Sequence, residues 1–327
     1  MDMDVALGEP EKVAAMNRKF RVTILGAPLL PDAISKIATE VASHGGNIDR
    51  IHRIADYPVT AIAFDGSGVD PDQIRRPLAE ISSSSGVDIA IQDQSLEARG
   101  QYLVVLDVDS TVIQDEVIDL LAERAGRLPE VAAITKSAME GGLDFPEALR
   151  QRVSLLAGLP ATALDDVREA ITLTPGARTL CRTLKRLGYR IALVSGGFTS
   201  VIAPIADELG VDVLRANELE IADGHLTGGV IGPIIDRVAK REVLEDLAST
   251  YQIPRRRTVA IGDGANDVDM LAAAGLGIAF NAKPITREVA DASVNVPYLD
   301  SVLFLLGVTR AEIEEADARE GTPTPRP

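Results

Sequence analysis

The stretch Leu103-Val104-Val105-Leu106-Asp107-Val108-Asp109-Ser110-Thr111 runs from four apolar residues directly into two carboxylates and a hydroxyl. A short, continuous apolar run of this kind is typical of a strand buried on both faces of a parallel sheet. Ligands of open α/β sheets bind just beyond the carboxyl ends of the strands. We therefore expect chemistry at Asp107 and Asp109. Taken alone, the segment is also compatible with an ordinary acidic turn after a strand.

The chain that follows alternates strand-like and helix-like patterns, which predicts an α/β fold with a doubly wound, mostly parallel sheet. This domain is expected over residues 100–310. Residues from about 113 to 172 carry only helical patterns, broken by Gly and Pro. Such an insertion is too long for an ordinary connection, so it predicts a helical cap over the site. Residues 311–327 are expected to form a C-terminal tail.

The preceding part of the chain has the pattern of a separate small domain. Residues 19–94 show the order βαββαβ, which is that of a ferredoxin-like domain. Residues 1–18 lack periodicity and are expected to be a disordered tail, and 95–100 are expected to form a linker.

Composition narrows the classes of function. Lys and Arg number 33 against 49 Asp and Glu, a formal charge of −16. This balance argues against nucleic acid and anionic membranes as partners, because both need a basic face. The single cysteine, Cys181, excludes an intramolecular disulfide. The acidic N-terminus has no apolar leader segment, so we expect a cytoplasmic protein.

Three polar clusters follow predicted buried strands, and one lysine lies between the last two. The clusters contain Asp107, Asp109 and Thr111; Ser195, Gly196 and Gly197; and Asp263, Asn266 and Asp267, with the lysine at Lys240. Carboxylates suit a hard cation such as Mg²⁺. An ammonium, a hydroxyl and glycine amides suit a phosphoryl group. Each cluster alone could be a turn, but their order on one sheet predicts a phosphoryl-transfer site.

These motifs resemble those of the haloacid dehalogenase-like superfamily over about residues 100–295. Asp107-Val-Asp109-Ser-Thr111 matches its DxDxT motif, and Ser195, Lys240 and Gly262-Asp-Gly-Ala-Asn-Asp267 match the other three in order. Within the superfamily, Asp107–Glu116, Glu147–Leu156 and Asp223–Gly228 look like the phosphoserine phosphatase family. The resemblance implies Mg²⁺-dependent hydrolysis of O-phospho-L-serine, the last step of serine biosynthesis.

The resemblance also implies roles for individual residues. Asp107 would be the nucleophile that forms an aspartyl-phosphate, and Asp109 the general acid and base. The metal would be held by Asp107, Asp263 and the backbone carbonyl of Asp109. Oxygens of the phosphoryl group would be bound by Ser195, Gly196, Lys240 and Asn266. Asp267 would orient Lys240 or the waters of the metal.

In the cap, the resemblance assigns substrate recognition to three residues. Glu116 matches the position that binds the ammonium group of phosphoserine. Arg152 matches the one that binds its carboxylate, for which a planar guanidinium is well suited. Phe145 matches an apolar residue over the site. From the residues alone, Arg152 could equally be a surface position of a helix.

Residues 20–94 resemble an ACT domain, a module that binds amino acids and controls metabolic enzymes. The resemblance rests on the βαββαβ order and on the turn Gly45-Gly46-Asn47-Ile48. It implies a homodimer and serine as an effector at Gly46 and Asn47. The glycines could instead serve only the reversal of the chain.

Two other functions stay open at this point. A phosphotransferase, or a phosphatase for another small phosphomonoester such as phosphohomoserine, would differ only in the shape of its pocket. A regulatory protein that has lost catalysis is disfavoured by the intact Asp107, Asp109, Lys240 and Asp263.

Overall fold

The computed structural model describes residues 19–94, 100–139 and 141–325. It divides into two compact units: one joins the chain up to Gly100 with the segment from Asp291 onward, and the other is Gln101–Ala290. The expected tail at 1–18 and most of the expected linker lie outside the described residues. Among the described residues, no helix is long and apolar enough to cross a membrane.

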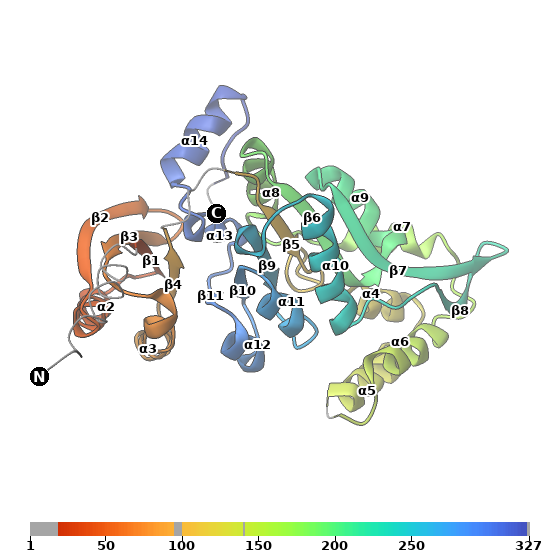
Figure 1. Ribbon diagram of the computed structural model, residues 1–327. Helices are drawn as coiled ribbons and strands as arrows, with labels where there is room; N and C mark the ends of the chain where they lie inside the picture. The colour runs from red at the N-terminus through yellow and green to blue at the C-terminus, as the bar shows by residue number, and fades with distance from the viewer. Residues whose placement is uncertain (1–18, 95–99, 140, 326–327) are drawn as a thin grey trace, which may run out of the picture. The chain divides into compact units, whose positions relative to one another are not determined.

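The first unit contains the predicted ferredoxin-like domain (Figure 1). Its four-stranded antiparallel sheet has the order β2-β3-β1-β4. The elements are β1 (Lys19–Gly26), α2 (Pro31–Ser43), β2 (Asn47–Ala55), β3 (Thr60–Ser67), α3 (Pro71–Ser85) and β4 (Asp88–Asp93). Apolar positions at helical spacing in α2, such as Ile37 and Val41, pack with Ile74 of α3 against Phe20 and Ile24 of the sheet. This part of the predicted fold class is confirmed.

The C-terminal segment of this unit corrects two expectations. It contains β11 (Ala292–Val294), η2 (Leu299–Ser301), α13 (Val302–Leu305) and α14 (Arg310–Arg319). Residues 291–310 group with the ferredoxin-like domain rather than with the phosphatase-like one. Residues 311–319 are helical instead of forming a tail, because Thr309 and Glu312 make a capping box that starts α14. Arg310 anchors this helix: it is 4% exposed and donates to Glu314.

The second unit has the predicted doubly wound sheet, in which the order within the unit is β10-β9-β5-β6-β7-β8. All neighbours are parallel except β7 and β8, which form a hairpin. The strands are β5 (Leu103–Leu106), β6 (Arg190–Phe198), β7 (Val213–Ala222), β8 (His225–Ile231), β9 (Thr258–Gly262) and β10 (Leu276–Phe280).

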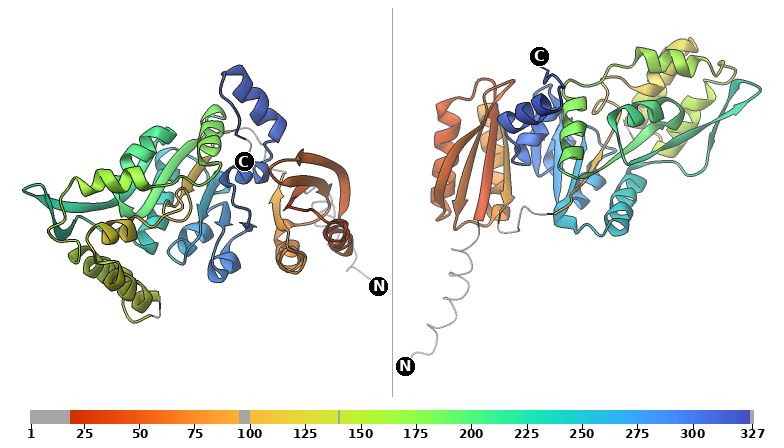
Figure 2. Two further views of the ribbon diagram at one scale, coloured as in Figure 1. Left: turned by 180° about the vertical axis from the view of Figure 1, so that it is seen from behind. Right: turned by 90° about the horizontal axis from the view of Figure 1, so that it is seen from above.

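Helices cover both faces of this sheet (Figure 2). One face carries α8 (Ala177–Arg186) and α9 (Thr199–Leu209), and the other carries α10 (Arg237–Thr250) and α11 (Val268–Ala273). The remaining elements of the core are η1 (Arg255–Arg257) and α12 (Pro284–Val289). Central strand β5 is fully buried, as expected for a continuous apolar run between two helical layers.

The predicted insertion folds as four helices: α4 (Val117–Arg124), α5 (Leu128–Met139), α6 (Phe145–Ser154) and α7 (Ala163–Ala170). Its two connections to the core are bridged to each other by Ile113 and Leu173. The β7–β8 hairpin is also joined to the insertion, because Leu226 donates to Leu159 and accepts from Gly158 through backbone groups at 2.9 and 2.8 Å. The cap is therefore fixed at its connections to the core by this bridge, and between α6 and α7 by the hairpin.

Candidate active site

The register of the sheet places the predicted site residues together. Leu106 at the end of β5 lies level with Leu193 of β6 and Ile261 of β9. Asp107, Ser195 and Asp263 follow these positions by one or two residues. The Asp107 amide donates to the Ile261 carbonyl at 2.9 Å, so the first acidic residue is fixed at the carboxyl edge of the sheet.

Lys240 lies between two of the carboxylates. Its Nζ atom is 2.7 Å from Oδ1 of Asp107 and 2.7 Å from Oδ1 of Asp267, and the side chain is 1% exposed. Asp236 caps the start of α10 by accepting from the Ala239 amide, which fixes the helix that carries Lys240. Burial alone would lower the pKa of Lys240, but the two carboxylates outweigh it and raise that pKa. The lysine is therefore a permanent cation.

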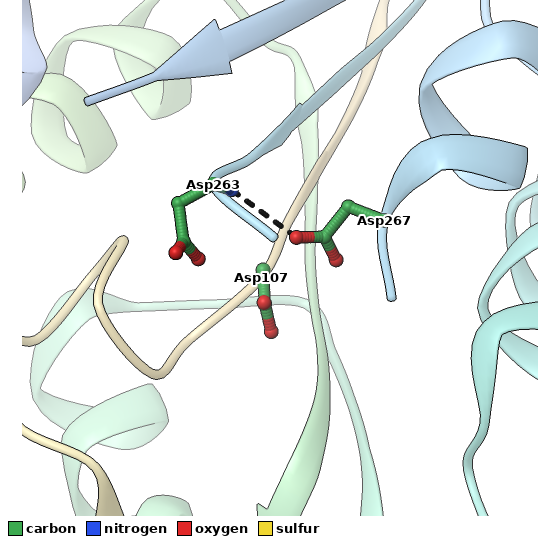
Figure 3. Close-up of side chains that lie close together, drawn as sticks. All are labelled: Asp107, Asp263 and Asp267. Atoms are coloured by element: carbon green, nitrogen blue, oxygen red, sulfur yellow. Dashed lines mark hydrogen bonds between the residues drawn. The ribbon is translucent and has the colours of Figure 1, made fainter. Parts of the chain in front are cut away.

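Both oxygens of Asp267 accept hydrogen bonds from the protein. Oδ1 accepts from Lys240, and Oδ2 accepts from the backbone amides of Asp263 and Gly264 at 3.1 and 3.0 Å. Figure 3 shows the bond from Asp263. A Cβ atom on Gly262 would lie 2.4 Å from the Asp267 carboxyl carbon, so glycine is required there. Asp267 thus connects the loop after β9 to the ammonium group of Lys240.

Asp109 has a different environment from Asp107. Its Oδ1 accepts from the Val117 amide at 2.8 Å, and its Oδ2 accepts from the Ser195 hydroxyl at 2.9 Å. Burial raises the pKa of Asp109, and these hydrogen bonds oppose the shift. A raised pKa favours the protonated form of a carboxyl, which is the form that a general acid needs.

Three carboxylates could hold a metal ion. One oxygen each from Asp107, Asp263 and Asp267 lie within 4.8 Å of one another (Figure 3). Three carboxylates face one ammonium, so the cluster carries excess negative charge. Burial, followed by the charge of Asp267, raises the pKa of Asp263 to about 6. A divalent cation would relieve this repulsion, so the donor set fits a hard metal.

The metal ligands expected from the sequence were Asp107, Asp109 and Asp263. The side-chain oxygens of Asp109 accept from Val117 and Ser195, and the ligand expected from this residue is its backbone carbonyl. The Asp263 carboxylate accepts a long hydrogen bond from the Thr111 hydroxyl, at 3.4 Å.

The phosphoryl-binding candidates also gather here. The Asn266 amide lies 3.4 Å from Oδ2 of Asp107. Ser195 is fully buried, and its hydroxyl accepts from the Gly197 amide at 2.7 Å. A Cβ atom on Gly196 would lie 3.0 Å from the Phe145 ring, so the cap residue is in contact with β6 at Gly196.

The two charged cap residues lie near Phe145 and the site. The Arg152 guanidinium carbon is 5.9 Å from the centre of the Phe145 ring, and Nη1 donates to Thr135 at 3.4 Å. Burial lowers the pKa of Arg152, while the charges of Asp119 and Glu116 oppose this shift. Arg152 is thus a partly buried cation that faces carboxylates.

Glu116 is a solvent-exposed residue that precedes α4. Surrounding protein atoms and, to a lesser extent, the charge of Asp109 raise its pKa to about 7. Ser110 donates to Oε1 of Glu116 at 2.8 Å. Sequence reasoning missed this role of Ser110, whose φ of 57° is unusual for a residue other than glycine. Only its place inside the DxDxT motif could have indicated it.

The candidate effector turn belongs to the other unit. A Cβ atom on Gly46 would lie 2.4 Å from a methyl group of Val69, so close packing alone explains this glycine. The Asn47 amide donates to Asp49 at 2.5 Å.

Comparison with known proteins gives the family. The family model for haloacid dehalogenase-like hydrolases matches residues 104–272, and that for the ACT domain matches 19–92. A phosphoserine phosphatase of Streptomyces coelicolor is 56% identical over 296 residues, which are 90% of this chain and 72% of that protein. One from Mycobacterium tuberculosis is 54% identical over 322 residues, 97% of this chain and 78% of that protein.

A solved structure described as a phospho-aspartyl intermediate analogue of phosphoserine phosphatase is also similar. It is 44% identical, has a TM-score of 0.60, and the match covers 63% of this chain and 99% of that one. With its acidic motif, its doubly wound sheet and its cap, the chain belongs to the haloacid dehalogenase-like hydrolases and carries an N-terminal ACT domain.

Proposed function

We propose that the protein hydrolyses O-phospho-L-serine to L-serine and phosphate, the last step of serine biosynthesis. The observation that carries the proposal is the pairing of Asp107 with the buried Lys240, beside an Asp109 whose pKa is raised. The similar proteins named phosphoserine phosphatase support the choice of substrate.

Asp107 acts as the nucleophile. Its Oδ2, which is not bonded to Lys240, forms the bond to phosphorus, and the bond between phosphorus and the serine oxygen breaks. Asp109 gives its proton to that oxygen. It then takes a proton from the water that attacks phosphorus, and the bond to Asp107 breaks. Lys240 and Asn266 hold the phosphoryl oxygens throughout.

Asp107, Asp263 and the Asp109 carbonyl would hold Mg²⁺. When bound, the ion would offset the repulsion between an anionic nucleophile and the anionic phosphoryl group. The excess of carboxylates over cations in the cluster supports this assignment.

A phosphate-release screen over small phosphomonoesters, with Mg²⁺ and with EDTA, tests the function. We expect phosphoserine to be turned over far better than phosphohomoserine, and only with the metal. Preference for another phosphomonoester would overturn the substrate. Transfer to added homoserine rather than to water would indicate a phosphotransferase.

Arg152→Ala should selectively impair substrates that carry a carboxylate. A hydrogen bond to a charged group contributes about 1.5–3 kcal/mol. We therefore expect kcat/KM to fall about ten- to a hundred-fold for phosphoserine, and far less for phosphoethanolamine. Arg150→Ala, an exposed position on the same helix, is the matched control and should change neither value. An equal loss on both substrates would make Arg152 structural.

Glu116 predicts a pH dependence. Its pKa is about 7, and only the ionised form can pair with an ammonium group. Hence kcat/KM for phosphoserine should rise with pH through about 7, and Glu116→Gln should remove this rise. 3-Phosphoglycerate, with a hydroxyl in place of the ammonium, should not show it even with the unaltered enzyme. Persistence of the rise in Glu116→Gln would contradict the assignment.

We also propose that the ACT domain forms a homodimer and binds the product serine at Gly46 and Asn47. The edge position of β2 and its exposed Ile51 support pairing. The Asn47 amide can donate and accept, as recognition of an amino acid requires.

Inhibition of the full chain by serine tests this effector site. We expect a non-competitive component that Asn47→Ala removes, because an effector must favour one global state over another. Ser67→Ala, which removes another hydrogen bond to Asp49, should keep it. Inhibition that is purely competitive and identical in Asn47→Ala would refute the role, and sedimentation at micromolar concentration reports the dimer.

A further inference from the structure

The ladder between β6 and β7 is interrupted where the site residues lie. Val194 pairs with Arg215, and the next pair is Phe198 with Asn217. Three residues of β6, Ser195 to Gly197, therefore stand opposite a single residue of β7. Such a bulge leaves main-chain groups without a ladder partner, and these groups need other partners when buried.

The Asn217 side chain supplies one of those partners. It is 1% exposed, and its Nδ2 donates to the Gly196 carbonyl at 2.8 Å. Its Oδ1 accepts from the Ile235 amide at 2.8 Å. Ile235 directly precedes Asp236, the residue that caps α10. A single buried amide thus connects the bulge of β6 to the segment that leads to Lys240.

The hydrogen bonds of Asn217 are the first of a chain that reaches Asp109. The peptide between residues 196 and 197 is held at its carbonyl by Asn217 and at its N–H by the Ser195 hydroxyl, at 2.7 Å. That hydroxyl in turn donates to Oδ2 of Asp109 at 2.9 Å. Rotation of this peptide would move the Ser195 hydroxyl, and with it the orientation of the Asp109 carboxyl.

We propose that Asn217 is a positioning residue for the general acid, acting through the 196–197 peptide and Ser195 on Asp109. The role rests on the proposed function, in which Asp109 protonates the leaving oxygen. The hydrogen bonds of the Asn217 side chain go to Gly196 and Ile235, not to Asp107 or Asp109. An amide is suited to the position because it offers a donor to the carbonyl and an acceptor to the amide on one rigid plane. A carboxylate in its place would keep the bond from Ile235 and lose the one to Gly196.

The leaving group provides the test. The serine oxygen needs a proton to leave, whereas the acetate of acetyl phosphate leaves without one. For Asn217→Ala and Asn217→Asp, we expect kcat/KM for phosphoserine to fall roughly ten- to a hundred-fold, and for acetyl phosphate to fall several-fold less, because both substrates share the phosphoryl group but only phosphoserine needs the proton. Because kcat/KM reports steps up to the first irreversible one, the later hydrolysis does not enter the comparison.

Thr258→Val is the matched control. Thr258 is also buried, and its hydroxyl donates to the Arg255 carbonyl and accepts from the Gly275 amide. It lies at the start of β9, at the end of the sheet opposite the site. It should lower the melting temperature and leave both substrates unaffected. Equal losses on the two substrates in Asn217→Asp, or no loss, would overturn the proposal. If Asn217→Ala does not fold, the more conservative Asn217→Asp decides. The unaltered enzyme tests the proposed function separately, by its turnover of phosphoserine.

Discussion

In Asp107→Asn we expect phosphatase turnover to fall by roughly 10⁴-fold or more, since the amide is nearly the same size but cannot attack phosphorus. No covalent phosphoenzyme should be captured by acid quenching and mass spectrometry. The fold should persist: burial and the charge of Asp267 raise the pKa of Asp107, so its ionised form opposes folding. A neutral amide relieves that cost, and the melting temperature of the metal-free protein should stay equal or rise.

Asp212→Asn is the matched control for that substitution. Asp212 lies at the amino-terminal end of β6, away from the site, where it accepts from Lys185, Arg190 and the Ile191 amide. We expect full activity and a lower melting temperature, the reverse of the pattern for Asp107→Asn. Normal turnover in Asp107→Asn, or a phosphoenzyme formed on another residue, would contradict the mechanism.

The catalytic cluster could be predicted because strand ends and chemistry coincide in the sequence. Asp107, Asp263 and Ser195 each follow a continuous apolar run, and parallel strands bring their carboxyl ends to one edge. Lys240 could be placed only through the family resemblance, because nothing local distinguishes it from a surface lysine until its burial beside two carboxylates is known.

Features that depend on long-range contacts were missed. Helix α14 follows from a capping box and from the burial of Arg310, but the residues around it are polar and charged and suggested a tail. Asn217 reads as a strand residue of no special note until the break in the β6–β7 ladder is seen. Gly46 suggested a ligand site, whereas contact with Val69 gives a packing reason for glycine there.

Lys240→Met should combine a large loss of stability with loss of activity. The substitution leaves Asp107 and Asp267, which are 2% and 0% exposed, without their cation. Removing one partner of a buried ion pair costs about 3–5 kcal/mol. We expect the urea midpoint of the metal-free protein to fall accordingly, with an unchanged slope. Phosphate release should fall below detection, because Asp107 loses the group that orients it.

The pH dependence of this loss separates charge from packing. The charge of Lys240 lowers the pKa of Asp107, so its removal should raise that pKa further. A carboxyl with a raised pKa in the folded state takes up a proton as the pH falls, and this protonation reduces the free-energy cost of burying it. Lys240→Met should therefore be less stable at pH 8 than at pH 6, whereas a packing defect would be equal at both.

Arg237→Met on the same helix provides the matched control. Arg237 is half exposed and pairs with Asp269 at 2.5 Å. Exposed pairs contribute at most about 1 kcal/mol, so its removal should shift the urea midpoint little at either pH. A Lys240→Met protein that matched Arg237→Met in stability would mean that Asp107 and Asp267 find other partners or stay protonated. The buried ammonium would then not be what holds the two carboxylates in place.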